Sequence, residues 1–164
     1  MGQPVGLRER LSHVFTRLCI VNDAVRIMHS MQLPRHTSGM DDVTVRRVDF
    51  GYFVRPPEET GTGMLRVEPC LGYLVEHPAG TLLFDTGMGS HADVEARYRP
   101  RRQPLAKALE TAGARLDQIT LVANCHLHFD HCGGNPLLVG RPVFTQATEL
   151  ADARHTVDYT LPEL

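Results

Sequence analysis

"HLHFDHCGGN", residues 126–135, contains three histidines and one aspartate within six positions, and two glycines follow them. The stretch comes directly after a short apolar run that is typical of a buried strand. In an extended segment, residues two apart point to the same side, so His126 and His128 would present both imidazoles to one metal ion. Asp130 and His131 would follow the end of the strand, where a turn can direct them to a second ion nearby. The stretch therefore predicts a metal centre at the end of a strand.

The ligand types in this stretch favour zinc. Imidazole together with carboxylate suits zinc best, with iron, manganese and cobalt as less favoured alternatives. Two ions ~3.5–4 Å apart and bridged by hydroxide form a hydrolytic centre, in which one ion polarises a carbonyl and both lower the pKa of water. Gly133 and Gly134 would let the backbone turn tightly beneath the ions, because they lack Cβ atoms. Cys125 and Cys132 flank the ligands and are expected to be free thiols, since Cys125 would point away from His126 on a strand.

The segments around this stretch alternate between strand and helix patterns. Strands are expected at residues 48–54, 70–77, 81–87, 119–125 and 140–146, and helices at residues 104–113 and 147–155. In the first strand Val48, Phe50, Tyr52 and Val54 follow one continuous period of two, which predicts a half-buried strand. The order of strands and helices predicts an α/β layered domain.

The N-terminal part of the chain has a different pattern. From Leu7 to Met28, apolar residues recur at steps of three and four, which predicts an amphipathic helix. Its polar face mixes acidic and basic residues, so we expect it to pack on the domain or on a second copy and not on a membrane surface. A second alternative is that Met40 is the natural start of the protein. We divide the chain into a helical extension, residues 1–42, and a domain, residues 43–164.

The bulk composition argues against several classes of partner. A formal net charge of −2 gives no electrostatic basis for binding nucleic acid or an anionic membrane. No stretch reaches the ~18 consecutive apolar residues that a helix needs to span a bilayer, and the N-terminus is not expected to be a signal peptide. The four cysteines form no CxxC pair, which indicates reduced thiols and a cytoplasmic location.

The stretch from 126 to 135 resembles the His-x-His-x-Asp-His motif of the metallo-β-lactamase superfamily, and it is most similar to the N-acyl homoserine lactone lactonase branch. "TLLFDTGM", residues 81–88, resembles the superfamily strand that ends in Asp-x-Gly. "GRPVFTQATELADA", residues 140–153, is similar to the strand and helix that follow the motif in those lactonases. The resemblance covers roughly residues 43–164. It implies an αβ/βα sandwich of which the first half is present.

The same resemblance implies roles for individual residues. It assigns His126 and His128 to a first metal ion, and Asp130 and His131 to a second, so that a complete site holds two Zn²⁺ ions. Asp130 would be the catalytic residue, because it would orient the bridging water or accept a proton from it. Asp85 would lie beside the site and orient its ligands. The alternative for Asp85 is a turn aspartate that caps the loop after a strand.

Members of the superfamily also use ligands that follow much later in the chain. The segment after Asn135 contains one histidine, His155, which is expected at the exposed end of a helix and not at the metals. Asp152 and Asp158 are likewise expected to be exposed. The resemblance therefore implies that this chain is the N-terminal half of a longer enzyme and is truncated near residues 158–164. The sheet of such a half would need cover from the missing second half or from another copy of the chain.

Three hypotheses of function follow from these features. The first is a zinc-dependent, quorum-quenching hydrolase that opens an N-acyl homoserine lactone ring by attack of a metal-bridged hydroxide. The second keeps the metal site but acts on another small-molecule ester, as a glyoxalase II-like thioester hydrolase or another ester or lactam hydrolase. The third is an inactive fragment or metal-binding half-domain that lacks the downstream ligands. Tyr52, Phe53 and Met64 could line an acyl-chain pocket in the first case, although core packing is the more ordinary role.

Overall fold

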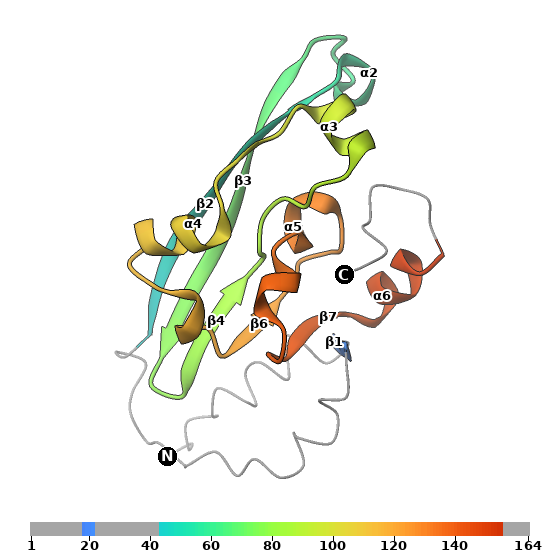
Figure 1. Cartoon of the computed structure of the whole chain (residues 1–164). Helices are drawn as coiled ribbons and strands as arrows, with labels where there is room; N and C mark the ends of the chain where they lie inside the picture. The colour runs from blue at the N-terminus through green and yellow to red at the C-terminus, as the bar shows by residue number, and fades with distance from the viewer. Residues whose placement is uncertain (1–17, 22–42, 156–164) are drawn as a thin grey trace, which may run out of the picture.

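The computed structural model describes residues 18–21 and 43–155, in which seven strands form one sheet (Figure 1). In spatial order the strands are β1 (Leu18–Val21), β7 (Val143–Gln146), β6 (Leu121–Ala123), β4 (Gly80–Phe84), β3 (Arg66–His77), β2 (Thr44–Arg55) and β5 (Arg101–Arg102). β4, β6 and β7 run parallel, and the other neighbouring pairs are antiparallel. The predicted α/β class is therefore confirmed.

Short helices occupy the connections between these strands. They are α2 (Pro57–Thr60), α3 (Ala92–Tyr98), α4 (Leu105–Thr111), α5 (Phe129–Cys132) and α6 (Ala147–Ala153), with 3-10 helices η3 (Leu116–Gln118) and η4 (Asn135–Leu138). Parallel strands need a crossover connection. The crossover from β4 to β6 contains α3 and α4, and the crossover from β6 to β7 contains α5 and η4. In the part of the chain that the structure describes, no helix has the length and apolar character that a membrane span requires.

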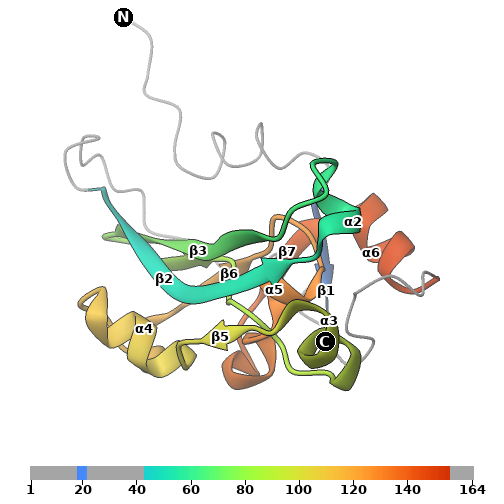
Figure 2. The ribbon, with the colours of Figure 1, turned by 90° about the horizontal axis from the view of Figure 1, so that it is seen from above.

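The main hydrophobic core lies between one face of the sheet and α4. Leu105, Ala108 and Leu109 of α4 are at most 5% exposed, and their spacing places them on one face of the helix. They pack in one buried cluster with strand residues such as Leu74 and Leu83, neither of which has any exposed surface. Figure 2 shows α4 and α3 on the same side of β2 and β3. This core fixes the parallel strands β4 and β6, whose ends carry the candidate site.

A second, aromatic cluster holds α5 against β2 and α3. The rings of Phe53 and Phe129 meet edge to face with their centroids 5.3 Å apart, and Tyr98 stacks on Phe129 at 5.0 Å. Such aromatic pairs contribute about 0.5–1.5 kcal/mol beyond the area they bury. Phe129 belongs to the histidine-rich stretch, so this cluster anchors that stretch to the domain. Phe53 is therefore a core residue, whereas Tyr52 and Met64 are 43% and 69% exposed.

A β-bulge in β2 explains why the continuous alternation predicted for this strand is wrong. The register with β3 shifts between Asp49 and Tyr52, so that Phe53, and not Tyr52, is buried. Gly51 lies in the bulge with a φ of 102°, a conformation that glycine adopts without steric cost. A Cβ atom at Gly51 would lie 1.9 Å from the carbonyl oxygen of Arg101 in β5. The close pairing of β5 thus requires a glycine at this point, and the bulge changes which residues face the core.

Two further elements differ from the expectation. Residues 18–21 form β1, antiparallel to β7, although the sequence predicts a helix there. Ile20 and Val21 are β-branched residues that favour strands, and pairing with the edge of β7 provides the backbone hydrogen bonds that a strand needs. The rest of the predicted N-terminal helix lies outside the described residues. No element was predicted at α3, although Val94 and Tyr98, four residues apart, are both buried and mark one face of a helix.

Candidate metal centre

The candidate site lies where two parallel strands end. β4 and β6 are neighbours, and Phe84 is paired with Ala123 at their carboxyl ends. Asp85 follows β4 directly, and the stretch from Cys125 to His131 follows β6. Parallel neighbours deliver the residues after their last positions to the same edge of the sheet. The sheet topology therefore brings Asp85 to a stretch that lies about 40 residues further along the chain.

His126, His128 and Asp130 form one group of potential metal ligands. One donor atom from each of the three side chains lies within 4.8 Å of the others. The imidazole centroids of His126 and His128 are 4.6 Å apart, and all three residues are partly buried. The sequence predicted that the two imidazoles would face the same side, and the structure does bring them together. Asp130 joins them because α5 begins at Phe129 and turns the carboxylate back toward the histidines.

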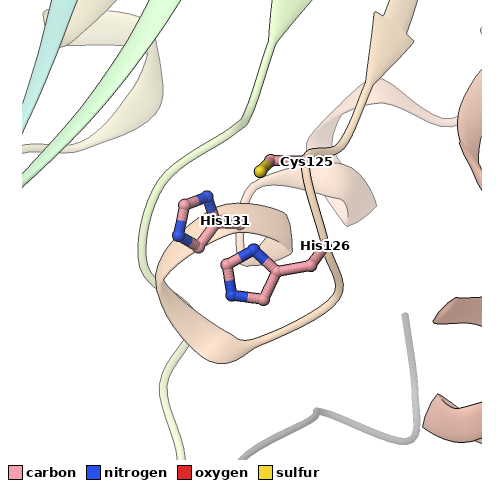
Figure 3. Close-up of side chains that lie close together, drawn as sticks. All are labelled: Cys125, His126 and His131. Atoms are coloured by element: carbon pink, nitrogen blue, oxygen red, sulfur yellow. The ribbon is translucent and has the colours of Figure 1, made fainter.

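A second group consists of Cys125, His126 and His131 (Figure 3). One donor atom from each of them again lies within 4.8 Å of the others, and the His126 and His131 rings are 4.0 Å apart. The expectation that Cys125 points away from His126 is wrong. β6 ends at Ala123 and the chain bends at Cys125, so the alternation of a strand does not extend to this residue. His126 is common to both groups.

Asp85 connects the two chain segments of the site through both of its carboxylate oxygens. Its Oδ1 accepts a hydrogen bond from the backbone N–H of Cys125 at 2.8 Å, and its Oδ2 lies 2.8 Å from Nδ1 of His131. Asp85 is 3% exposed and has a φ of 63°, in the left-handed region that aspartate enters more readily than most residues. A carboxylate on one ring nitrogen leaves the other free to bind a metal. The geometry favours the orienting role predicted for Asp85.

The charges of the cluster are strongly coupled. Burial lowers the pKa of His131, but its contacts with the Asp130 and Asp85 carboxylates outweigh burial and raise the pKa to about 9. Burial raises the pKa of Asp130, but the hydrogen bond to His131, the charge of His131 and smaller contributions from the backbone and His126 together outweigh it, so this pKa lies below its ordinary value. Burial, followed by the neighbouring His131 and His128, lowers the pKa of His126. His131 is thus the residue that holds a proton between two carboxylates, and a bound cation would replace that proton.

A network of neutral polar side chains fixes the backbone of α5. The carbonyl oxygen of His131 accepts hydrogen bonds from the Thr86 N–H at 2.8 Å and from Nδ2 of Asn124 at 2.9 Å. Asn135 joins this network, because its Nδ2 donates to Oδ1 of Asn124 and its Oδ1 accepts from Oγ1 of Thr86. Sequence reasoning missed these three roles. Their positions in the sequence could have indicated these roles, because Thr86 and Asn124 follow strand ends and Asn135 ends the histidine-rich stretch.

The close approach of two backbones explains the glycine after α5. A Cβ atom on Gly133 would lie 1.8 Å from the nitrogen of Gly89. The two segments also exchange main-chain hydrogen bonds, from Gly133 N–H to the Gly87 carbonyl at 2.9 Å and from Gly89 N–H to the Phe129 carbonyl at 2.6 Å. Gly133 and Gly134 both have ordinary right-handed backbone angles, so the predicted tight turn is not their reason. Position 133 requires glycine because the neighbouring backbone leaves no space for a Cβ atom.

Glu149 is a further residue that sequence reasoning missed. Its Oε1 accepts a hydrogen bond from the Leu127 N–H at 2.8 Å, which ties α6 to the segment between the two histidines. Asp152 and His155, at the far end of α6, are exposed as predicted. Asp158 lies outside the described residues.

Cys70 and Cys132, the other two cysteines of residues 43–155, have different surroundings from Cys125. Cys70 and Cys132 are buried, and their thiols donate to backbone carbonyls, that of Cys70 to Asp130 at 2.8 Å. Burial raises the pKa of Cys132 to about 12. Burial followed by the nearby Asp85 also raises the pKa of Cys125, but this thiol is exposed. Cys125 and Cys132 are both free thiols as predicted, but Cys132 is buried and hydrogen-bonded, whereas Cys125 is accessible.

The donor set fits a divalent cation. The two overlapping groups offer imidazole nitrogens, a carboxylate oxygen and a thiol sulfur, which are the ligand types that zinc takes in proteins. Asp85 supplies the carboxylate that commonly supports a ligating histidine. The partition of the ligands between two ions, as the resemblance assigns it, stays a prediction.

Comparisons with known proteins agree with this site. Residues 65–161 match the family model of the Metallo-beta-lactamase superfamily. An N-acyl homoserine lactonase of Bacillus thuringiensis is 32% identical over 110 residues, which cover 59% of this chain and 44% of that relative. The chain thus spans about half the length of the curated relatives it matches.

Solved structures show the same likeness. An N-acyl homoserine lactone hydrolase with the product N-hexanoyl-L-homoserine bound at its catalytic metal center gives a TM-score of 0.61 at 26% identity, covering 73% of this chain and 54% of that one. A quorum-quenching N-acyl homoserine lactone lactonase gives 0.60 at 27% identity, covering 73% and 51%. Together with the sheet, the strand-end Asp85 and the histidine cluster, the match over residues 65–161 shows that this chain belongs to the metallo-beta-lactamase superfamily.

Proposed function

We propose that this chain carries metal ligands of a zinc-dependent lactonase that opens the ring of N-acyl homoserine lactones. The observation that carries the proposal is the convergence of His126, His128 and Asp130 within 4.8 Å, with His131 held beside them by Asp85. The similarity to N-acyl homoserine lactonases, at 32% identity, supports the substrate class. The matched segment covers 44% of that relative, so we further propose that the remaining ligands come from a further segment or from a second copy of the chain.

The residues would share the work as follows. The two histidines of the His-x-His pair would bind a first Zn²⁺, and Asp130 with His131 a second. When bound, the ions would polarise the lactone carbonyl and lower the pKa of the attacking water. Asp85 would keep the proton of His131 on Nδ1, so that Nε2 is free to bind. Leu127 N–H, fixed by Glu149, would keep the segment between the two histidines in place.

Asp130 would handle the proton in the ring opening. The oxygen of a water adds to the ester carbonyl carbon of the lactone, and the water proton passes to the Asp130 carboxylate. The bond between this carbon and the ring oxygen then breaks. The ring oxygen leaves with its electron pair and receives the proton from Asp130, which yields the hydroxy acid. Asp130 can take this role because its carboxylate lies beside the imidazoles of His126 and His128, and its pKa, below the ordinary value, keeps it deprotonated at neutral pH.

The test is a turnover assay of the zinc-loaded chain. N-acyl homoserine lactones of several chain lengths and an S-acylglutathione are offered in parallel, and ring opening or thioester cleavage is measured. We expect ring opening, its abolition in His126→Ala, and no change in His155→Ala, because His155 is exposed at the far end of α6. Cleavage of the thioester alone would favour the glyoxalase II-like alternative. A zinc-loaded chain that hydrolyses nothing would exclude a second copy of the chain as the source of the remaining ligands, and it would favour the half-domain alternative.

A further inference from the structure

Cys125 lies closer to the histidines than its position before the motif suggests. Its sulfur and one ring nitrogen each of His126 and His131 lie within 4.8 Å of one another, and Figure 3 shows the three side chains directed into the same small space. Three donors at such mutual distances can reach one cation at ordinary ligand bond lengths, which are ~2.3 Å for a Zn–S bond and ~2.0–2.1 Å for a Zn–N bond.

The same carboxylate places two of the three donors. Asp85 holds the Cys125 backbone through Oδ1 and the His131 ring through Oδ2, each at 2.8 Å. Asp85 is buried and belongs to a different segment of the chain, so it acts as a fixed reference point for both. The backbone of Cys125 and the ring of His131 are therefore held in fixed positions, from which the Cys125 side chain reaches His131.

The Cys125 thiol also differs from the other described thiols in being available. Those of Cys70 and Cys132 donate to backbone carbonyl oxygens and are buried. Within residues 43–155 the Cys125 thiol makes no such hydrogen bond, and its residue is exposed. A sulfur beside two imidazoles, free of a competing partner, is a ready donor for a cation that accepts soft ligands.

We propose that Cys125 is a metal ligand, and that its sulfur, His126 and His131 together bind one thiophilic divalent cation such as Zn²⁺. As the sulfur–metal bond forms, the thiol proton passes to solvent, and a water completes the coordination. A thiolate favours zinc, cadmium and cobalt over magnesium and calcium, so this set would make the chain selective for soft or borderline cations. This arrangement describes the chain with a single ion bound, in which His126 and His131 share that ion, and it is an alternative to the partition of the ligands between two ions. The proposal rests on the metal binding in the proposed function, but it does not require lactone hydrolysis.

Cobalt provides a test that does not depend on activity. The metal-free chain, kept under a thiol-free reductant, is given one equivalent of Co²⁺, and its absorption spectrum is recorded. A cysteine ligand gives a thiolate-to-cobalt charge-transfer band in the near ultraviolet, separate from the visible d–d bands. We expect this band in the parent chain, and its loss in Cys125→Ser. In the matched control Cys132→Ala, which removes the cysteine at the other end of the cluster, we expect the band to persist.

A second measurement covers failure of a variant to fold. X-ray absorption at the zinc edge of the parent chain should show a sulfur scatterer at ~2.3 Å, and Cys125→Ser should lower zinc affinity at least ~10-fold in competition with a chelator. Bound cobalt with no charge-transfer band, or a band that persists in Cys125→Ser, would overturn the thiolate ligand and leave the metal centre standing. A parent chain that binds no cobalt or zinc would overturn both.

Discussion

Oδ2 of Asp85 lies 2.8 Å from Nδ1 of His131, and the two residues come from different strand ends of the sheet. Asp85 is buried, whereas the His131 side chain is 23% exposed and its ring has a second nitrogen directed toward Asp130 at 3.3 Å. Asp85 thus orients the ring of a potential ligand through Nδ1, and Nε2 of the same ring is directed toward the site. Its contribution can be separated from that of the ligands themselves.

Removal of the Asp85 charge should weaken metal binding without unfolding the protein. Asparagine has the same shape and tolerates the left-handed backbone at this position, so Asp85→Asn keeps the local fold but loses the anionic partner of His131. We expect zinc affinity to fall ~10–100-fold, measured by competition with a chelator. The control is Asp117→Asn, which removes an aspartate paired with Arg115 at the surface. Equal affinity in Asp85→Asn and the parent chain would contradict the orienting role.

The stability of the metal-free protein should fall between neutral and alkaline pH. His131 has a folded-state pKa of about 9, above the ~6.5 of an unfolded histidine. The folded state therefore binds this proton more tightly, so its stabilising contribution is complete below pH ~6.5 and disappears as pH rises through about 9. Urea denaturation at pH 6.5, 8 and 9.5 should show a falling midpoint. In His131→Gln this part of the decline should be absent, and a decline of equal size there would assign the effect to other groups.

Gly133→Ala should be more destabilising than Gly61→Ala, although only Gly61 has a positive φ. A Cβ at Gly133 would lie 1.8 Å from a backbone nitrogen, whereas one at Gly61 would meet nothing within 4 Å. The first variant must displace backbone, which we expect to reduce the free energy of unfolding by ~3 kcal/mol or more. The second variant carries only the cost of the left-handed conformation, ~1–2 kcal/mol. Chemical denaturation of both variants gives the order, and the reverse order would contradict the close contact at Gly133.

The bulge in β2 makes a similar contrast between neighbours. Phe53 is 3% exposed and packs on Phe129, whereas Tyr52 is 43% exposed. We expect Phe53→Ala to lower the free energy of unfolding by ~3–5 kcal/mol. Tyr52→Ala should cost less than ~1 kcal/mol, as surface substitutions usually do. Similar losses for the two variants would indicate an unbroken alternation through this strand.

Much of the fold could be predicted, because the strands and longer helices carry periodic apolar patterns. The buried strand β6 and helix α4 lie within the ranges expected from the sequence, and the hairpin of β3 and β4 overlaps its expected strands, although β3 begins at Arg66 and not at Cys70. The exceptions depend on contacts between distant segments. β1 exists because residues 18–21 pair with β7, and the phase of β2 changes because Gly51 accommodates β5. Neither partner can be identified from the local pattern.

The candidate site could be predicted as a list of residues but not as an arrangement. The motif identifies His126 and its neighbours, and the upstream strand identifies Asp85. The inward position of Cys125 could not be predicted, because it depends on where β6 ends and on a hydrogen bond from a segment 40 residues away. The roles of Asn124 and Thr86 were hidden for the same reason, since both bind the backbone of α5 from other segments.

The reciprocal main-chain hydrogen bonds between the Gly87–Gly89 segment and α5 have a mechanical consequence. They join main-chain atoms and hold the two segments together without any side chain, but only while glycine at position 133 leaves room for the close approach. The segment continues directly into α3, whose first residues are exposed. We therefore expect a displacement of α5 to move the Gly87–Gly89 segment and, with it, Ser90 at the protein surface. A reporter group attached at Ser90 would sense events at the cluster from outside it, without occupying any of its donors.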